Sequence, residues 1–395
     1  MLAKSDVLER ARELKPQLVA LRRAIHRFPE LGFEVRRTAD LVAQTLYHLG
    51  IEFQMGVGKT GVVATIGENP GPVIALRADM DALPIQEVNE VGYASEVPGV
   101  MHACGHDAHT AMLLGAAMLL HEMKFDGQIR LLFQPSEEAV DSENKSGAQR
   151  MLEDGALAGV NAAVALHVDG RFDSGKISIT HGPATAAVDT FQATIVGHGG
   201  HGAYPHTTTD PIWLTTQVLN ALYSIPSRHV NPASPVVVTV GQVHGGTASN
   251  VIPDRVFIEG TLRSYTDDVR GKIVEEVRRA LEVVRAFGGT YDLSVGHGYP
   301  STINAPGVAE VVKEAGLALL GDDGLSPWQQ GMGGEDFSFV TREVPSAFFR
   351  LGVRQPGGPV KHLHTANFDI DEDALPIGSA VLAQSALWLL VQQHE

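Results

Sequence analysis

The sequence predicts an α/β protein with a mostly parallel central sheet, interrupted by an inserted α+β domain. Short apolar runs alternate with helical patterns through residues 1–181 and again over 299–395, as is typical of a parallel sheet covered by helices. Between them, residues 182–298 follow the order strand, helix, strand, strand, helix, strand, which is the pattern of a ferredoxin-like unit. We therefore expect a first domain made of 1–181 and 299–395 and a second domain made of 182–298.

The N-terminal elements are predicted from the spacing of apolar residues. Residues 6–28 carry apolar side chains three or four positions apart and predict one amphipathic helix. A second helix is expected over 38–49. Strands are expected over 61–66 and 73–77, and the second is a continuous apolar run of the kind that helices cover on both faces.

Polar side chains follow the carboxyl ends of three predicted strands, which are 73–77, 128–133 and 162–166. Active sites of open α/β sheets lie at such ends. A single polar residue there commonly marks only the end of burial, but three strands with the same feature predict a site. The residues concerned are Asp79, Asp81, Glu137, Glu138 and His167.

The later elements complete the two domains. In the inserted domain, strands are expected over 188–196, 235–243, 255–264 and 290–295, with helices over 210–224 and 267–287. In the first domain, helices are expected over 147–154, 305–320 and 377–393, with a strand over 347–352.

Composition limits the possible functions. The 395 residues include 46 acidic and 30 basic ones, and the net charge of −16 argues against nucleic acid or an anionic membrane as a partner. The single cysteine permits no intrachain disulfide. We expect no apolar run of membrane-spanning length, and residues 1–6 lead into a charged pattern and not into a signal-peptide core. A cytoplasmic protein is therefore expected.

The densest group of candidate metal ligands is the segment 101–109, Met-His-Ala-Cys-Gly-His-Asp-Ala-His, at the start of a predicted helix. It holds Cys104 with three histidines and an aspartate. Thiolate and imidazole bind borderline-soft divalent metals. Alternatively, Cys104 is a small buried apolar residue and the histidines are core residues with satisfied hydrogen bonds. The segment by itself leaves both interpretations open.

Two glycine-rich segments are similar to nucleotide-binding motifs but lack the context. Residues 58–60 end like a phosphate loop, but Phe53 stands where its first glycine should be. Residues 197–202 match G-x-G-x-x-G, but 203–205 are Ala-Tyr-Pro, which cannot open a helix immediately. We expect these glycines to let the backbone pass close to a ligand while His201 points at it.

Other polar residues have two interpretations each. Glu137 and Glu138 could be a solvated pair, but adjacent strand residues face opposite ways, so one could ligate a metal while the other accepts a proton. Arg263 could be a surface cation or could pair with a substrate carboxylate. Asn250 stands in what otherwise looks like a plain turn, and His364 could be loop decoration or could complete a metal shell.

A series of motifs in a fixed order covers almost the whole chain. The motifs are 26–30, 74–84, 101–110, 133–138, 166–168, 199–206, 250–253, 334–337 and 364–366. Together they resemble the hippurate hydrolase, or N-acyl-amino-acid amidohydrolase, branch of the dinuclear-metal aminoacylase/carboxypeptidase family, which includes plant indole-acetyl-amino-acid hydrolases. The resemblance implies a metal-binding catalytic domain interrupted by a lid that often dimerises, and thus a homodimer or dimer-based homo-oligomer.

The resemblance also implies roles in a metal centre. Glu137 matches the general acid/base, and Asp81 matches an acidic residue that orients a ligating imidazole. Asp79 stands where more distant relatives have a metal-binding histidine, and its role stays open. The implied metal ligands are Cys104, His106, Glu138, His167 and His364.

In the inserted domain the resemblance implies substrate-binding residues. His201 and Asn250 match residues that contact the region of the scissile carbonyl, and Arg263 matches the arginine that binds a carboxylate. One departure from the branch is the segment 139–146, which intervenes before the expected glycine-rich stretch.

The implied reaction is the metal-dependent hydrolysis of the amide bond of an N-acyl amino acid, hippurate-like or N-acetyl, to a carboxylic acid and a free amino acid. Two divalent ions per subunit are expected, zinc first, with manganese, nickel or cobalt as alternatives. The rival enzyme is a dipeptidase or carboxypeptidase with the same dinuclear site. A binding protein without turnover and a nicotinamide-dependent dehydrogenase are the rivals from other classes.

Overall fold

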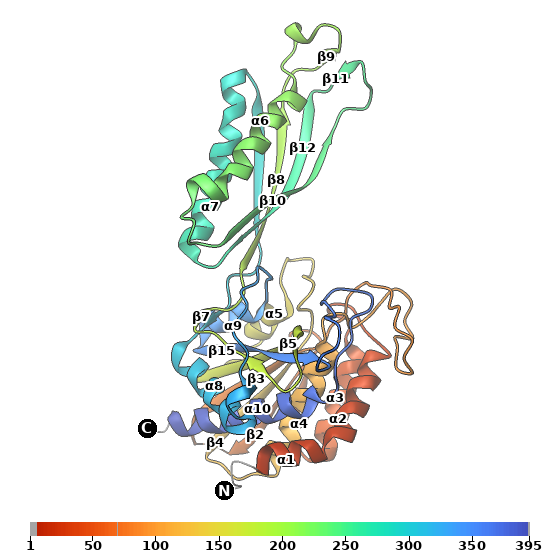
Figure 1. The fold of residues 1–395 in the computed structure, drawn as a ribbon, viewed down its shortest axis with the longest axis vertical. Helices are drawn as coiled ribbons and strands as arrows, with labels where there is room; N and C mark the ends of the chain where they lie inside the picture. The colour runs from red at the N-terminus through yellow and green to blue at the C-terminus, as the bar shows by residue number, and fades with distance from the viewer. Residues whose placement is uncertain (1–5, 69, 394–395) are drawn as a thin grey trace. The chain divides into compact units, whose positions relative to one another are not determined.

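The computed structural model describes residues 6–68 and 70–393, which form two compact units (Figure 1). The larger unit contains the chain up to Ala184, Ile303–Gln329 and the chain from Asp336. The smaller unit contains Thr185–Thr302 and Gln330–Glu335. The prediction that the first six residues do not begin a signal-peptide core falls mostly on residues 1–5, which lie outside the described residues.

The larger unit is built on a seven-stranded sheet with the order β1-β2-β4-β3-β5-β15-β6. The four strands β4, β3, β5 and β15 run parallel, and the pairs at the two edges are antiparallel. The prediction of a mixed α/β fold with a mostly parallel sheet is therefore confirmed. The strands are β1 (Phe53–Val57), β2 (Gly61–Glu68), β3 (Val73–Asp79), β4 (Gly127–Gln134), β5 (Ala162–Asp173), β6 (Ile177–Ser178) and β15 (Ser346–Arg354).

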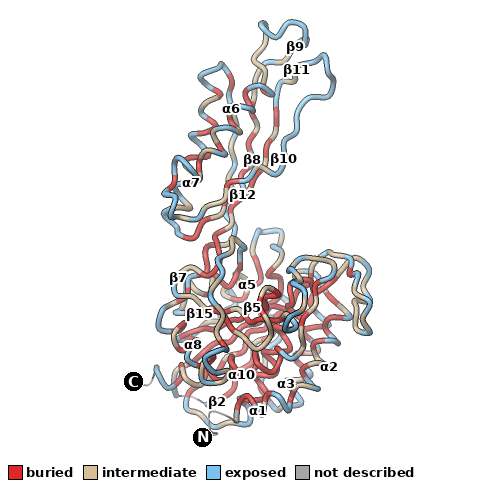
Figure 2. The backbone as a smooth tube through the Cα atoms, in the orientation of Figure 1, coloured by how far each residue is buried: buried red, intermediate tan, exposed pale blue. Residues whose placement is uncertain are grey.

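Two helices, α4 (His106–His121) and α10 (Ala374–Gln392), contact each other and form much of the core of the larger unit (Figure 2). Residues 106–120 of α4 are all buried, as expected for a helix that is apolar on every side. The other helices of this unit are α1 (Asp6–Glu13), α2 (Lys15–His26), α3 (Arg36–Leu49), α5 (Gly147–Glu153), α8 (Pro306–Leu320), η4 (Asp322–Gly324) and α9 (Phe337–Glu343), and a short pair of strands is β7 (Gly182–Pro183) with β14 (Ile303–Asn304).

Three sequence predictions for this unit are wrong in detail. The expected helix over 6–28 is two helices that break at Leu14, because Pro16 cannot donate an N–H and its ring crowds the preceding turn. Strand β1 was not expected, since its side chains are mostly exposed. Strand β5 does not end at His167, because β15 continues to pair with it as far as Asp173.

The expectation that no apolar run reaches membrane-spanning length is also wrong. Helix α10 is long and apolar enough to cross a membrane, and it begins three residues before the expected start at Ile377. Most of this helix is buried inside the unit, where it packs against α4 and α8. Its place in the core accounts for its composition.

The smaller unit has a four-stranded antiparallel sheet with the order β10-β12-β8-β13. Burial alternates along β8 and β12, so one face of the sheet carries the core, which includes residues of α6 and α7. Residues 197–202 contain a short strand, Gly200–His201, and are followed by the three-residue 3-10 helix Pro205–Thr207 and not by an α-helix. The elements are β8 (Ala187–Val196), β9 (Gly200–His201), η1 (Pro205–Thr207), α6 (Pro211–Ser224), η2 (Ile225–His229), β10 (Val236–Gly245), β11 (Val251–Ile252), β12 (Arg255–Ser264), α7 (Asp267–Glu282), η3 (Val283–Phe287) and β13 (Thr290–His297).

The segment 330–335 belongs to the smaller unit, although its neighbours in sequence belong to the larger one. The Tyr265 hydroxyl donates a 2.7 Å hydrogen bond to the carbonyl of Gly331, and the Ala186 N–H donates one of 2.9 Å to Gly333. The sequence carried no signal that the segment 330–335 joins the smaller unit, because these hydrogen bonds use backbone carbonyls, which every residue has.

Candidate metal centre

Side chains from four separate stretches of the chain meet in the larger unit. The Cys104 Sγ lies 3.3 Å from the Nε2 atoms of both His167 and His364. The His364 Nε2 lies 3.0 Å from the Glu138 Oε1. Donor atoms of His106, Glu137 and Glu138 also lie within 4.8 Å of one another. The structure thus brings together all five residues that the sequence analysis named as metal ligands, with Glu137 beside them.

Local backbone geometry brings Cys104 and His106 to this point. Gly105 caps α4 with a φ of 88°, a left-handed conformation that favours glycine. A Cβ at this position would lie 2.3 Å from Cγ2 of Val168. Glycine is therefore required between the two candidate ligands for both conformational and steric reasons.

Hydrogen bonds to backbone carbonyls set the tautomers of two histidines. Nδ1 of His106 lies 2.8 Å from the carbonyl oxygen of Asp81, and Nδ1 of His167 lies 2.8 Å from that of Val168. Since a carbonyl only accepts, each Nδ1 carries a hydrogen and donates it, which leaves Nε2 as the ring atom that can ligate a metal. The His106 Nε2 is buried and has no hydrogen-bond partner among the described residues. The Nε2 of His167 lies against the Cys104 Sγ, and the Nε2 of His106 is the unpartnered nitrogen among the candidate ligands.

The carboxylate of Asp81 holds the Glu137–Glu138 pair. Its two oxygens accept 3.0 Å hydrogen bonds from the backbone N–H groups of Glu137 and Glu138. This corrects the expected placement of the pair at a strand end, because β4 stops at Gln134 and Ser136 has a φ of 48°. A turn held by Asp81, and not the alternation of a strand, sets the directions of the two carboxylates. The sequence did not reveal this contact.

The side chains at the centre carry the kinds of atom that a divalent cation binds. Burial, with Glu138 and Glu137 close by, raises the pKa of the Cys104 thiol well above its ordinary value. Burial lowers the pKa of His167 to about 3, so its ring is neutral. One thiol, two carboxylates and three imidazoles are a donor set that suits zinc and its neighbours. The residues present therefore fit metal binding.

A buried ionic cluster near this segment was missed by the sequence analysis. Arg22 on α2 is fully buried, and its Nε lies 2.7 Å from the carboxylate of Asp107. Nδ1 of His26 lies 2.7 Å from the same oxygen of Asp107. The sequence did contain a signal for this cluster. Arg22 occupies a position in the apolar stripe that Leu18 and Ile25 form, and a buried cation is rare unless it is paired. The contact anchors the first turn of α4, next to His106.

The three predicted substrate-binding residues all lie in the smaller unit. His201 pairs with Val251 in the β9–β11 ladder, and Asn250 accepts a 2.8 Å backbone hydrogen bond from Gly202, so His201 and Asn250 are neighbours. Both are exposed. Arg263 lies on β12, where its Nε donates a 3.1 Å hydrogen bond to Thr261, and it has no ion-pair partner within the described ranges.

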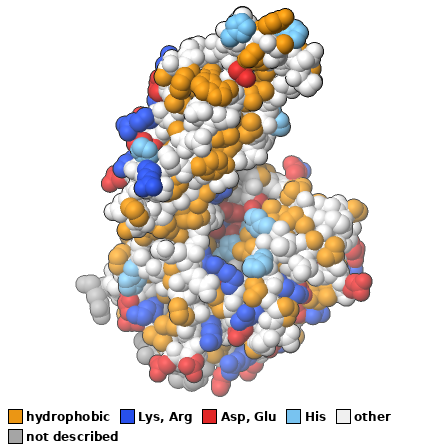
Figure 3. Space-filling view, turned by 45° about the horizontal axis from the view of Figure 1, so that its top comes forward, with side chains coloured by type: hydrophobic (Ala, Val, Ile, Leu, Met, Phe, Trp, Pro, Cys, Tyr) orange, Lys and Arg blue, Asp and Glu red, His pale blue; other side chains and the backbone are white. Residues whose placement is uncertain are grey.

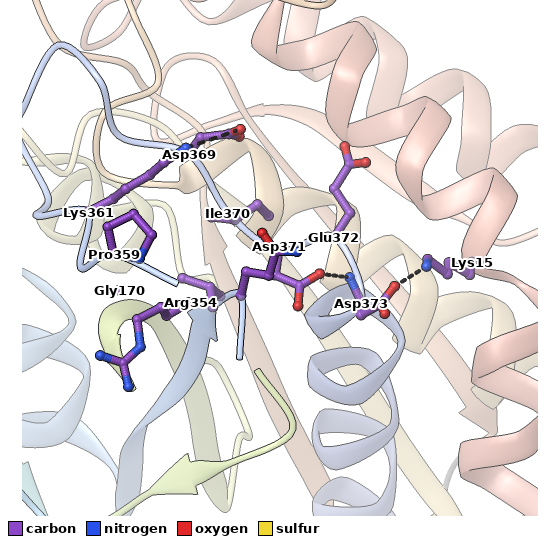
Figure 4. Close-up of a pocket in the computed structure, with 12 residues that line it drawn as sticks. Lys15, Gly170, Arg354, Pro359, Lys361, Asp369, Ile370, Asp371, Glu372 and Asp373 are labelled. Atoms are coloured by element: carbon purple, nitrogen blue, oxygen red, sulfur yellow. Dashed lines mark hydrogen bonds and ion pairs between the residues drawn. The ribbon is translucent and has the colours of Figure 1, made fainter. Parts of the chain in front are cut away.

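Figure 4 shows a pocket of about 340 Å³ in the larger unit. Its cations are neutralised, since Lys15 pairs with Asp373, Lys361 lies 3.7 Å from Asp369, and Arg354 lies 2.7 Å from Asp173. None of the five candidate ligands lines it. The pocket therefore gives no reason to move the site.

The fold and the donor set define a metal-dependent hydrolase, and comparison with known proteins gives the family. The model for peptidase family M20/M25/M40 matches residues 75–387. The chain is 41% identical over 387 residues to the N-acetyl-L-cysteine deacetylase of Bacillus subtilis, covering 97% of this chain and 90% of that protein. It is 39% identical over 391 residues to thermostable carboxypeptidase 1 of Saccharolobus solfataricus, covering 97% of each.

A solved structure has the same architecture. A dinuclear metal-binding peptidase of the M20 family from Bacillus subtilis superposes with a TM-score of 0.83 at 34% identity, covering 96% of this chain and 99% of that one. The chain therefore belongs to peptidase family M20/M25/M40, and it is a metal-dependent amidohydrolase or peptidase. The resemblance noted from its motifs is confirmed.

Proposed function

We propose that this protein hydrolyses the amide bond of N-acyl amino acids, hippurate-like or N-acetyl, and releases a carboxylic acid and a free amino acid. The observation that carries the proposal is a pair of adjacent sets of candidate metal ligands that share Cys104. One set contains His106 and His167, and the other contains Glu138 and His364. Glu137 lies beside both sets as the proton carrier. The deacetylase named above supports an N-acyl substrate.

Two divalent ions, with zinc proposed first and manganese, nickel or cobalt as alternatives, would lower the pKa of a water molecule and polarise the amide carbonyl. Cys104, His106, Glu138, His167 and His364 would hold them. The carboxylate of Glu137 accepts a proton from the attacking water and then donates it to the leaving amine nitrogen. Asp81 keeps Glu137 in place through the backbone N–H bond. We further propose His201 and Asn250 as binders of the acyl carbonyl and Arg263 as the binder of the carboxylate.

The test is metal analysis of the purified protein followed by an activity panel on the metal-loaded protein. Hippurate, N-acetyl amino acids and Gly-Gly are offered in parallel. We expect two ions per chain and turnover of the N-acyl amino acids above the dipeptide. Two ions with no turnover of any N-acyl amino acid would contradict the proposal.

A carboxypeptidase or dipeptidase is the second candidate, since the chain is 39% identical to thermostable carboxypeptidase 1. The same site chemistry would serve both substrates, because both reactions hydrolyse an amide next to a carboxylate. A ratio of kcat/KM that favours peptides over N-acyl amino acids in the panel would select this candidate.

We also propose that the smaller unit pairs with a second copy of the chain. Its visible face carries many hydrophobic side chains (Figure 3), and β10 is an edge strand with unpaired backbone groups on one side. Trp213 and Phe287 contact each other and are each nearly half exposed. Light scattering of wild type and of Trp213→Ser would test this, and a monomeric wild-type protein would overturn it.

A further inference from the structure

His109, on the same face of α4 as His106, uses both of its ring nitrogens. Its Nδ1 lies 2.6 Å from Oδ1 of Asp79, and its Nε2 accepts a 3.0 Å hydrogen bond from the backbone N–H of Val168. Because an N–H only donates, the Nε2 carries no hydrogen and the Nδ1–H must donate to Asp79. His109 therefore has one tautomer, and neither ring nitrogen is left to bind a metal, although the ring lies among the candidate ligands.

Both carboxylate oxygens of Asp79 are also hydrogen-bonded. Its second oxygen lies 2.6 Å from Nη1 of Arg77, and both residues are buried. Asp79, His106 and His109 lie close enough together to hold a cation. Their hydrogen bonds leave only His106 with a free nitrogen. The position of Asp79, open in the sequence, is thus that of a carboxylate that orients His109.

The network continues away from the metal centre. Arg77 also lies 2.8 Å from the carboxylate of Asp336, and Gln134 donates to the same carboxylate at 2.8 Å. The backbone N–H of Ala148 donates to it at 3.0 Å. This buried network joins β3, β4, α5 and the start of α9. Arg77, Asp79 and Asp336 are the charged members of this network, and removing one of them leaves a buried charge uncompensated.

His109 replaces a missing strand partner at the end of this network. Strand β3 pairs with β5 only as far as Ala165, so beyond that point this side of β5 has no neighbouring strand. The Val168 N–H lies in that stretch, and a buried N–H needs an acceptor. His109 supplies it from α4. The rings of His109 and His167 also pack edge to face, with centroids 4.7 Å apart.

We propose that His109 is a positioning residue for His167. By holding the Val168 N–H, it fixes the backbone next to His167, whose own Nδ1 is bonded to the Val168 carbonyl. The buried network of Asp336, Arg77 and Asp79 keeps the His109 ring in this orientation. The proposal rests on the proposed function, because it assigns the support of one ligand of the proposed metal centre.

Two variants separate the two hydrogen bonds of His109. The amide of His109→Gln places an oxygen near the former Nε2, where it can accept from Val168. The amide of His109→Asn lies near the former Nδ1, where it can donate to Asp79 but cannot reach Val168. His48→Asn, on the exposed side of α3, is the matched control. Circular dichroism verifies that each variant folds.

The readouts are the Co²⁺ dissociation constant by chelator competition, the visible spectrum of the Co²⁺-loaded protein, and hydrogen exchange at Val168 without metal. We expect His109→Asn to bind Co²⁺ about tenfold to a hundredfold more weakly, with an altered spectrum and faster exchange at Val168. We expect His109→Gln and His48→Asn to stay close to wild type. Equal effects of the Asn and Gln variants, or none with Asn, would overturn the proposal.

A measurement on the wild-type protein keeps the proposal testable if the variants do not fold. Correlation spectra of ¹⁵N-histidine-labelled, metal-free protein report the tautomer of each ring. We expect His109 to be neutral with its hydrogen on Nδ1, and the Nε2–H tautomer would overturn the proposal. Wild-type protein that binds no Co²⁺ would instead refute the metal centre itself, while the tautomer and the exchange at Val168 would still decide the role of His109.

Discussion

The carboxylate of Asp81 binds the backbone N–H groups of both Glu137 and Glu138, each at 3.0 Å. One side chain thus orients the proposed proton carrier and one proposed metal ligand at the same time. The backbone carbonyl of Asp81 also accepts from the Nδ1 of His106. Asp81 therefore connects three of the sequence motifs, which are 74–84, 101–110 and 133–138.

Replacing Asp81 by Asn should therefore reduce turnover without unfolding the protein. The amide has one acceptor where two N–H groups need one each, so Glu137 or Glu138 loses its backbone anchor. We expect kcat to fall about tenfold to a hundredfold, as for other groups that orient metal ligands. Steady-state kinetics tests this, with the exposed Asp40→Asn as the control. Wild-type kcat in Asp81→Asn would show that the anchor is dispensable.

Glu137→Gln should remove turnover and leave the metal content unchanged. The amide keeps the size of the side chain but cannot accept a proton from water, and general acid–base catalysis contributes about 10²–10⁴-fold. Glu138→Gln should instead lower metal content, since Glu138 lies with Cys104 and His364. Metal analysis and kcat together distinguish the two. If Glu137→Gln keeps wild-type kcat, another group carries the proton.

Removal of metal should abolish activity and lower Tm. A ligand that binds only the folded state stabilises it by about 2.7 kcal/mol at a free concentration of one hundred times Kd. Dialysis against a chelator followed by calorimetry measures the loss, and added Zn²⁺ or Co²⁺ should restore both Tm and activity. An unchanged Tm after verified metal removal would contradict the proposed centre.

Gly105→Ala should be more damaging than another glycine substitution at positive φ. Both Gly105 and Gly99 have left-handed backbones, with φ of 88° and 75°. A Cβ at Gly99 meets nothing within 4 Å, whereas one at Gly105 would meet Val168 Cγ2 at 2.3 Å. Gly99→Ala should therefore cost only the strain of about 1–2 kcal/mol. Gly105→Ala should exceed this cost in denaturant unfolding and should also weaken Co²⁺ binding. Equal effects would show that the contact with Val168 relaxes freely.

The pair of Asp189 and Arg270 should make the stability of the smaller unit depend on pH. Burial raises the pKa of Asp189, but hydrogen bonds from Arg270 outweigh it and hold the pKa below its usual value of 3.8. Because the folded pKa is depressed, the stabilisation is present above pH 3.8 and is lost as the pH falls toward the folded pKa. Asp189→Asn should lower the free energy of unfolding by about 1–3 kcal/mol at pH 7 and remove this part of the acid dependence. Urea unfolding at pH 7 and pH 3 measures both effects, and an equal loss at the two pH values would contradict the assignment.

The sequence by itself determined the class of fold, the metal-binding family and the residue types of the site. Buried parallel strands read as continuous apolar runs, and the thiol, imidazole and carboxylate groups of the motifs carry their chemistry with them. Local patterns failed where a distant contact decides the outcome. The extension of β5 past His167 is such a case, because the distant strand β15 pairs with it there. The break near Leu14 is instead a local effect of Pro16, which the apolar spacing alone did not indicate.

Only the tertiary structure decided how the groups are held. Cys104 and His364 are 260 positions apart, yet their donor atoms lie 3.3 Å from each other. The Asp81 contact with Glu137 and the His109 contact with Val168 depend on backbone N–H groups that every non-proline residue has. A hydrogen bond to such a group leaves no mark on the identity of the residue that donates it. For this reason the sequence names the candidate ligands, and only the folded chain shows what positions them.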